Sequence, residues 1–161
     1  MADLENTLYL DLATHKNEAK GRVTIALRPD LAPNHVAQIK ALAREGFYDN
    51  VVFHRVIEGF MAQGGDPTGT GTGGSKKPNL RQEFSKEPHV RGICSMARST
   101  NPDSANSQFF IVFGDASFLD RQYTVWGQVT EGMDIVDTIK RGEPVREPDK
   151  IARMQVAADA K

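Results

Sequence analysis

Apolar and polar residues alternate over several short stretches of the chain, a pattern typical of β-strands with one buried face. Residues 7–12 place three leucines on one face, and residues 23–27 repeat the alternation after the turn-forming sequence at 19–21. These two stretches predict an opening β-hairpin. Further strands, most of them bounded by Gly, Pro, Asn or Asp, are predicted at 51–57, 60–64, 93–97, 109–113, 125–129 and 151–156.

Two segments have the apolar spacing of helices instead. Residues 33–45 begin with a proline, which suits a first helical turn, and Gly46 follows where a helix tends to end. Residues 131–140 place three apolar side chains on one face, with Thr130 as N-cap and Gly142 as the stop signal.

The order of these elements constrains the fold. About eight short strands with two helices and no βαβ alternation argue against a parallel sheet. They favour an antiparallel barrel or sandwich covered by helices, in a single domain spanning residues 1–161. Residues 64–90 are rich in Gly and Pro, and a loop of that length is usually functional or packed on itself.

Composition narrows the function classes. Twenty basic and 21 acidic residues give a net charge of −1, which offers no footprint for nucleic acid or a membrane surface. A single cysteine, Cys94, excludes an internal disulfide framework and is expected to be a small core residue. No apolar run approaches the roughly 20 residues of a membrane span, and the start lacks a secretory pattern. We therefore expect a cytoplasmic protein.

Two features resemble cofactor sites without supporting one. Residues 69–74 match the spacing G-x-G-x-x-G, but no βαβ unit surrounds them and Pro78 disfavours a following helix. A nucleotide-dependent enzyme would need measurable affinity for NAD or ATP, and we interpret the segment as a surface loop. The four histidines are scattered, with no pair at ligand spacing, so neither a metal nor another cofactor is predicted.

The segment 53–66 carries the chemistry. In a strand, Phe53, Arg55 and Ile57 would share a face, and an arginine between two large apolar residues is uncommon unless it is paired or aimed at something. Adjacent residues in a strand point to opposite sides, so Phe60 and Met61 cannot enter one core, and the same holds for the two phenylalanines at 109–110. Two interpretations stay open at this point: an outer barrel face covered by a helix or loop, or an exposed apolar pocket beside an arginine.

Residues 53–66 read Phe-His-Arg-x-Ile-x-Gly-Phe-Met-x-Gln-Gly-Gly-Asp, which resembles the signature of the cyclophilins, the cyclosporin-binding peptidyl-prolyl cis-trans isomerases. Residues 107–111, 118–120 and 125–129 follow in the family's order, so that the resemblance extends from about Thr7 to Val156. It implies a mainly β fold, a closed eight-stranded antiparallel β-barrel capped by two α-helices. It also implies an isomerase that accelerates X–Pro rotation in protein folding without a cofactor.

The resemblance assigns roles by position. Arg55 matches the catalytic arginine, and Gln63 the glutamine that hydrogen-bonds the substrate backbone. The backbone near Ala97 and Arg98 matches the part that holds the residue preceding proline. The substrate-binding positions that it implies are His54, Phe60, Met61, Ala97, Arg98, Gln108, Phe110, Phe118, Leu119 and Tyr123.

Two aromatic positions depart from strongly cyclosporin-sensitive members and look like those of many bacterial cyclophilins. Phe118 stands where tryptophan is frequent and Tyr123 where histidine is frequent. Because Phe118 lacks an indole N–H, reduced cyclosporin affinity is expected. The segment 98–102 is also one residue longer than in common eukaryotic members.

The expected partners are proline-containing peptides and unfolded or folded client proteins, and the chain is expected to be a monomer. A non-catalytic proline-peptide binding module on the same fold is the alternative function. Such a module would not need Arg55.

Overall fold

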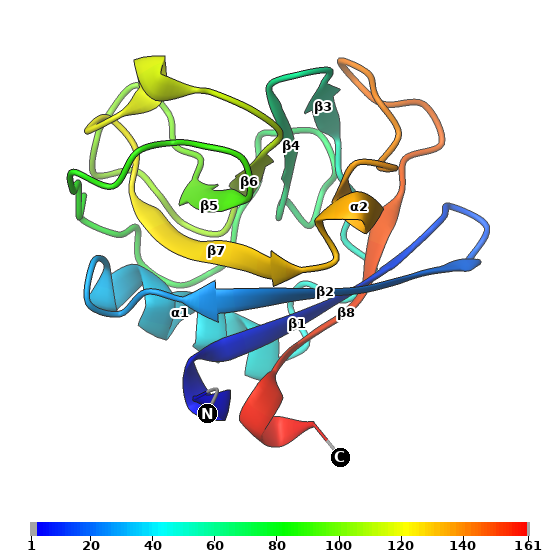
Figure 1. Cartoon of the computed structure of the whole chain (residues 1–161), viewed down its shortest axis with the longest axis horizontal. Coiled ribbons are helices and arrows are strands. Elements are labelled where there is room, and N and C mark those ends of the chain that lie inside the picture. Colours follow the sequence, from blue (N-terminus) through cyan, green and yellow to red (C-terminus); the bar gives the residue numbers. More distant parts are fainter. Residues whose placement is uncertain (1–2, 161) are drawn as a thin grey trace.

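The computed structural model describes residues 3–160, in which one antiparallel sheet of eight strands curls into a half-barrel with two α-helices packed against it (Figure 1). The strand order in the sheet is β3-β4-β6-β5-β7-β2-β1-β8. The strands are β1 (Thr7–Ala13), β2 (Ala19–Leu27), β3 (Arg55–Ile57), β4 (Met61–Gly64), β5 (Ile93–Met96), β6 (Phe109–Val112), β7 (Val125–Glu131) and β8 (Lys150–Val156). The helices are α1 (Pro33–Arg44) and α2 (Met133–Val136), with short 3₁₀ turns η1 (Leu4–Asn6), η2 (Ser117–Leu119) and η3 (Ala157–Asp159).

The sheet is open, and the expectation of a closed barrel is wrong. Its edge strands β3 and β8 form no ladder with each other. The outer edge of β3 pairs with the loop before β8 instead, since Val56 and Gly142 exchange two backbone hydrogen bonds of 2.9 Å. Only irregular contacts, such as the bridge between Val52 and Lys150, join the segment before β3 to β8. With three residues, β3 is too short to complete a barrel seam.

The predicted opening hairpin is confirmed, but its turn lies at 14–18, and residues 19–21 begin strand β2 instead of forming the turn. β1 and β2 pair antiparallel, with Leu10 opposite Val23, and the inward side chains of both strands are fully buried. At the centre of the core the Phe109 ring meets three aromatic rings edge-on, those of Tyr48, Phe53 and Trp126, at centroid distances of 5.7, 6.4 and 5.7 Å. Such pairs stabilise a core by about 0.5–1.5 kcal/mol each beyond their buried area.

Helix α1 agrees with its prediction to within one residue and buries Val36, Ile39 and Leu42. Its first turn is capped from a distance, because the carboxylate of Glu83 accepts hydrogen bonds from the backbone N–H groups of Asn34 and His35. No local sequence pattern indicates this cap.

Helix α2 is much shorter than the predicted 131–140. Strand β7 continues to Glu131, and Gly132 then turns the chain with a φ of 88°. A Cβ at Gly132 would lie 2.6 Å from the carbonyl oxygen of Arg22, so only glycine fits there. Beyond Val136 the backbone forms tighter three-residue hydrogen bonds.

Among residues 3–160 there is no helix with both the length and the apolar character needed to cross a bilayer.

Candidate functional site

An apolar hollow lies on the outer face of the sheet. Its floor is formed by Met61 of β4 and Phe110 of β6, which lie on neighbouring, paired strands. The hollow has a volume of about 170 Å³, below the roughly 300–1,000 Å³ of pockets for drug-sized ligands, and therefore suits a single side chain. Its lining consists of Arg55, Phe60, Met61, Gln63, Ala97, Arg98, Phe110, Leu119 and Tyr123.

The Phe110 ring is held from two sides. It meets the ring of Tyr123 edge-on at 5.7 Å, and the buried ring of His89 stacks on it at 6.2 Å. The nitrogens of His89 lie 2.9 Å from Ser95 Oγ and 3.1 Å from Asp120 Oδ1. Burial lowers the pKa of His89, against the opposing effect of the Asp120 carboxylate.

Ser95, His89 and Asp120 are the residue types of a hydrolase triad, but a substrate has no access to them. Ser95 and His89 are both fully buried, and Ser95 Oγ donates a hydrogen bond to the carbonyl oxygen of Thr124. A substrate carbonyl cannot reach the hydroxyl, so the cluster supports the pocket floor rather than acyl transfer.

Arg55 and Gln63 form the polar rim of the apolar hollow. They are register partners on β3 and β4, and Arg55 Nη1 donates to Gln63 Oε1 at 3.4 Å. Arg55 Nε donates to Glu143 Oε2 at 3.2 Å. The Arg55 side chain is 44 % exposed, so the guanidinium lies at the boundary between the hollow and solvent.

One detail of the predicted strand is wrong. Phe53 does not share a face with Arg55 and Ile57, since Phe53 is buried in the inner core while Ile57 packs against the cluster beneath the apolar hollow. The reason is that the strand begins at Arg55. The preceding residues follow an irregular path, so period-two alternation does not apply to them.

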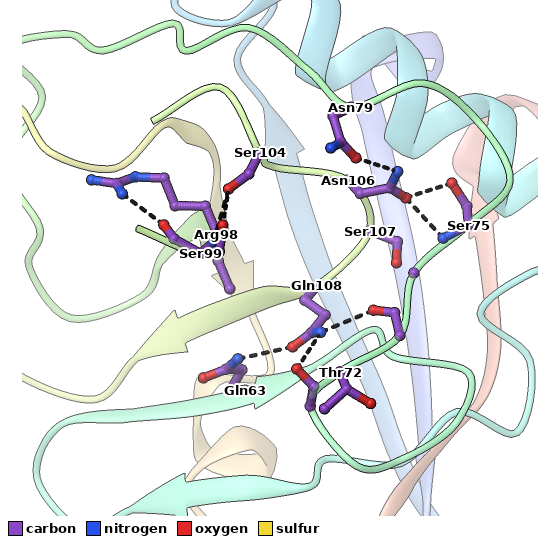
Figure 2. Close-up of a pocket in the computed structure, with 14 residues that line it drawn as sticks. Gln63, Thr72, Ser75, Asn79, Arg98, Ser99, Ser104, Asn106, Ser107 and Gln108 are labelled. Atoms are coloured by element: carbon purple, nitrogen blue, oxygen red, sulfur yellow. Dashed lines mark hydrogen bonds between the residues drawn. The ribbon is translucent and has the colours of Figure 1, made fainter. Parts of the chain in front are cut away.

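Hydrogen bonds extend from Gln63 to the glycine-rich loop. Gln63 Nε2 donates to Gln108 Oε1 at 3.0 Å, and Gln108 Nε2 donates to the carbonyl oxygens of Gly71 and Gly73, each at 3.0 Å (Figure 2). The loop thereby connects, through two glutamines, to the guanidinium of Arg55.

Asp66 holds this loop in place. Its carboxylate accepts hydrogen bonds from the backbone N–H groups of Thr68, Thr70, Gly71 and Gly73. Burial would raise the pKa of Asp66, but hydrogen bonds from the loop outweigh it and lower the pKa to about 2. The glycine-rich motif thus directs its N–H groups at the protein's own carboxylate, and no βαβ unit surrounds it.

A second, polar hollow of about 370 Å³ is shown in Figure 2. It adjoins the apolar hollow, since Gln63, Ala97 and Arg98 line both. Asn106 organises its far wall through hydrogen bonds with Ser75 and Asn79.

The Arg98 side chain braces the boundary between the two hollows. It donates from Nε and Nη2 to the carbonyl oxygen of Gln122, and it covers the Tyr123 ring at 4.7 Å.

The structure brings most of the predicted residues to one place. Gln108 lies in the polar hollow, and Phe118 stands at the rim with its ring 5.3 Å from that of Phe60. His54 lies apart, in a third hollow on the other side of Arg55, and burial lowers its pKa. The sequence did not predict that Glu143 contacts Arg55 or that Asp66 holds the glycine-rich loop. No sequence pattern around either residue indicates a connection to Arg55.

No group of three or more His, Cys, Asp or Glu side chains in the described part of the chain is arranged to hold a metal ion.

The family model described as cyclophilin type peptidyl-prolyl cis-trans isomerase/CLD matches residues 9–156. The chain belongs to this family. A probable peptidyl-prolyl cis-trans isomerase of Brucella suis is 54 % identical over 99 % of this chain and 87 % of its own length. A peptidyl-prolyl cis-trans isomerase of Helicobacter pylori is 42 % identical over 88 % of this chain and 86 % of its own length. Cyclophilin membership makes the chain an isomerase, as its sequence indicated.

Two solved cyclophilin structures share the fold. The cyclophilin AquaCyp293 from Hirschia baltica superimposes with a TM-score of 0.88 at 30 % identity, over 99 % of this chain and 77 % of that one. A cyclophilin-type isomerase of Cryptosporidium parvum, crystallised in the presence of the dipeptide Ala-Pro, gives a TM-score of 0.83 at 27 % identity, over 93 % of this chain and 98 % of that one.

Proposed function

We propose that this cyclophilin binds the proline ring of an X–Pro peptide in the apolar hollow and accelerates rotation by donating a hydrogen bond from Arg55 to the proline nitrogen as the amide twists. The observation that carries this proposal is the position of the Arg55 guanidinium on the rim of a hollow sized for one side chain. The Ala-Pro dipeptide associated with the Cryptosporidium relative supports proline-containing peptides as substrates.

The chemistry of rotation explains why an arginine suffices. The barrier to peptide rotation, about 18–20 kcal/mol, arises because the nitrogen lone pair is delocalised into the carbonyl. In the twisted state that lone pair becomes available as an acceptor. A donor that bonds it there, and not in the planar state, stabilises the transition state selectively. No nucleophile, metal or proton carrier is needed, because no bond breaks.

The Arg55 hydrogen bond alone does not supply the free energy that the acceleration requires. Lowering an isomerisation time of ~10–100 s to milliseconds needs roughly 10⁴–10⁵-fold acceleration, or about 5.5–7 kcal/mol. A hydrogen bond to a charged group contributes about 1.5–3 kcal/mol. The remainder is assigned to the exclusion of water when the proline ring fills the apolar hollow, and to fixed orientation of the peptide by Gln63 and the backbone near Ala97.

Two-dimensional exchange NMR on an Ala-Pro peptide tests the proposal and separates it from a non-catalytic binding module. The wild type is expected to bring cis/trans exchange onto the millisecond scale, and Arg55→Ala to lose most of this acceleration while the peptide still binds. Equal exchange rates with the two proteins would contradict the role of Arg55. Binding by the wild type without acceleration would favour the module.

A further inference from the structure

The loop between α2 and β8 is fastened to the chain on both sides of Arg55. Gly142 exchanges two backbone hydrogen bonds of 2.9 Å with Val56, and Val145 N–H donates to the carbonyl oxygen of His54 at 3.1 Å. At the base of the loop, the guanidinium of Arg141 donates to Glu58 and covers the Phe113 ring at 4.4 Å. These attachments hold the residues between Gly142 and Val145 directly opposite Arg55.

Glu143 lies within this fastened stretch and contacts the guanidinium. Its Oε2 accepts from Arg55 Nε at 3.2 Å, while Gln63 Oε1 accepts from Nη1 at 3.4 Å. The two acceptors bind different nitrogens of a planar group, so together they restrict both its position and the rotation of its plane. Of the five N–H donors of the guanidinium, two are used in this way, and the other three have no protein partner among residues 3–160.

We propose that Glu143 is a positioning residue for the isomerisation: its carboxylate fixes the plane of the Arg55 guanidinium so that the remaining N–H donors are available to the twisted amide. This inference rests on the proposed function of Arg55. Glu143 does not line the apolar hollow. It lines the third hollow, of about 530 Å³, together with His54, Gly69, Thr70 and Pro144.

The solvent exposure of the Arg55–Glu143 ion pair limits how much the removal of Glu143 can lower kcat. The Arg55 and Glu143 side chains are 44 % and 54 % exposed, and an exposed ion pair favours one geometry by a factor of about 1.4 to 5. Because Glu143 stands apart from the hollow that holds proline, its removal is expected to lower kcat and to leave KM nearly unchanged. Salt screens exposed charges, so high ionic strength is expected to remove the difference between the wild type and the variant.

The experiment compares Glu143→Gln and Glu143→Ala with the control Glu147→Gln. Glu147 belongs to the same loop and is 67 % exposed, but its carboxylate contacts His15 and Lys140 instead of Arg55. Two quantities are measured: kcat and KM on an Ala-Pro peptide at low and high salt, and the rate of rotation about the Arg55 Cζ–Nε bond by nitrogen-15 NMR without peptide.

Glu143→Ala is expected to lower kcat about 1.4- to fivefold at low salt and to accelerate the Arg55 rotation. Glu143→Gln keeps an acceptor oxygen and is expected to fall between Glu143→Ala and the wild type, whereas Glu147→Gln is expected to match the wild type. An unchanged or increased kcat in Glu143→Ala overturns the inference, with or without a change in the rotation.

An Arg55→Ala variant measured in the same series separates the two proposals. Full turnover by that variant rejects the proposed function itself. Loss of turnover in Arg55→Ala together with wild-type values in Glu143→Ala rejects only the positioning role.

Discussion

Phe109 and Phe110 are neighbours in β6 and lie on opposite sides of the sheet. Phe109 packs at the centre of the inner core, while Phe110 forms the floor of the apolar hollow. One short strand therefore contributes both to the inner core and to the hollow in which we propose that proline binds.

Replacing Phe109 tests the structural half of this division. Phe109→Ala removes a ring that is in contact with three other aromatic rings, and it is expected to lower the free energy of unfolding by about 3–5 kcal/mol. Chemical denaturation measures this loss, and a decrease below about 1 kcal/mol would be inconsistent with the packing described.

Replacing Arg55 with lysine tests the geometry of the donor rather than its charge. Lysine keeps the positive charge but is a point charge without the planar set of N–H donors. Arg55→Lys is expected to bind the Ala-Pro peptide normally and to lose about 10- to 150-fold in kcat, the equivalent of one charge-assisted hydrogen bond. Exchange NMR measures the rate and calorimetric titration the affinity; wild-type turnover in this variant would argue against a hydrogen bond to the twisted nitrogen.

The lowered pKa of Asp66 leads us to expect that the free energy of unfolding depends on pH. The loop hydrogen bonds lower its pKa in the folded protein from an ordinary value of 3.8 to about 2. The carboxylate therefore stabilises the fold above about pH 4, and this contribution is lost as the pH falls through 4 towards 2. Asp66→Asn is expected to lower the free energy of unfolding at pH 7 by about 2 kcal/mol and to flatten its pH dependence in this range.

Denaturation curves of the wild type and Asp66→Asn between pH 2 and pH 7 provide the measurement. Parallel curves for the two proteins would show that the pKa of this carboxyl is not linked to folding.

Phe118 is expected to influence the affinity for cyclosporin. It is 64 % exposed at the rim of the apolar hollow, and its ring has no donor. Phe118→Trp adds an indole N–H at that rim and is expected to tighten cyclosporin binding about two- to tenfold, the equivalent of one ordinary hydrogen bond. Titration calorimetry measures the dissociation constant, and no change would count against the expectation that the missing indole N–H reduces affinity.

Local patterns were sufficient to predict most elements of the sheet. Alternation located β1 and β2, and the neighbouring phenylalanines at 109–110 indicated a second apolar environment outside the core. That prediction succeeded because adjacent residues in a strand face opposite sides. The same argument is wrong for Phe60 and Met61, which both line the apolar hollow, because Phe60 lies in the turn before β4 and not in the strand.

What local patterns could not supply depends on contacts between distant segments. Glu143 reaches Arg55 across 88 positions of the chain, and Glu83 caps α1 across 48. The prediction of a closed barrel was wrong for the same reason, because it depended on a contact between distant segments. Gly142 pairs with the outer edge of β3, and nothing in the sequence around Arg55 indicates this pairing.

The occupied edge of β3 has a consequence for behaviour in a crowded solution. An open sheet normally presents unpaired N–H and carbonyl groups that can recruit a strand from another molecule and begin aggregation. Here Gly142 covers the backbone of Val56, and the opposite edge at Ile151 is bonded to Asn50 and Val51. The molecule thus covers the edges of its sheet at Val56 and Ile151 without closing the sheet.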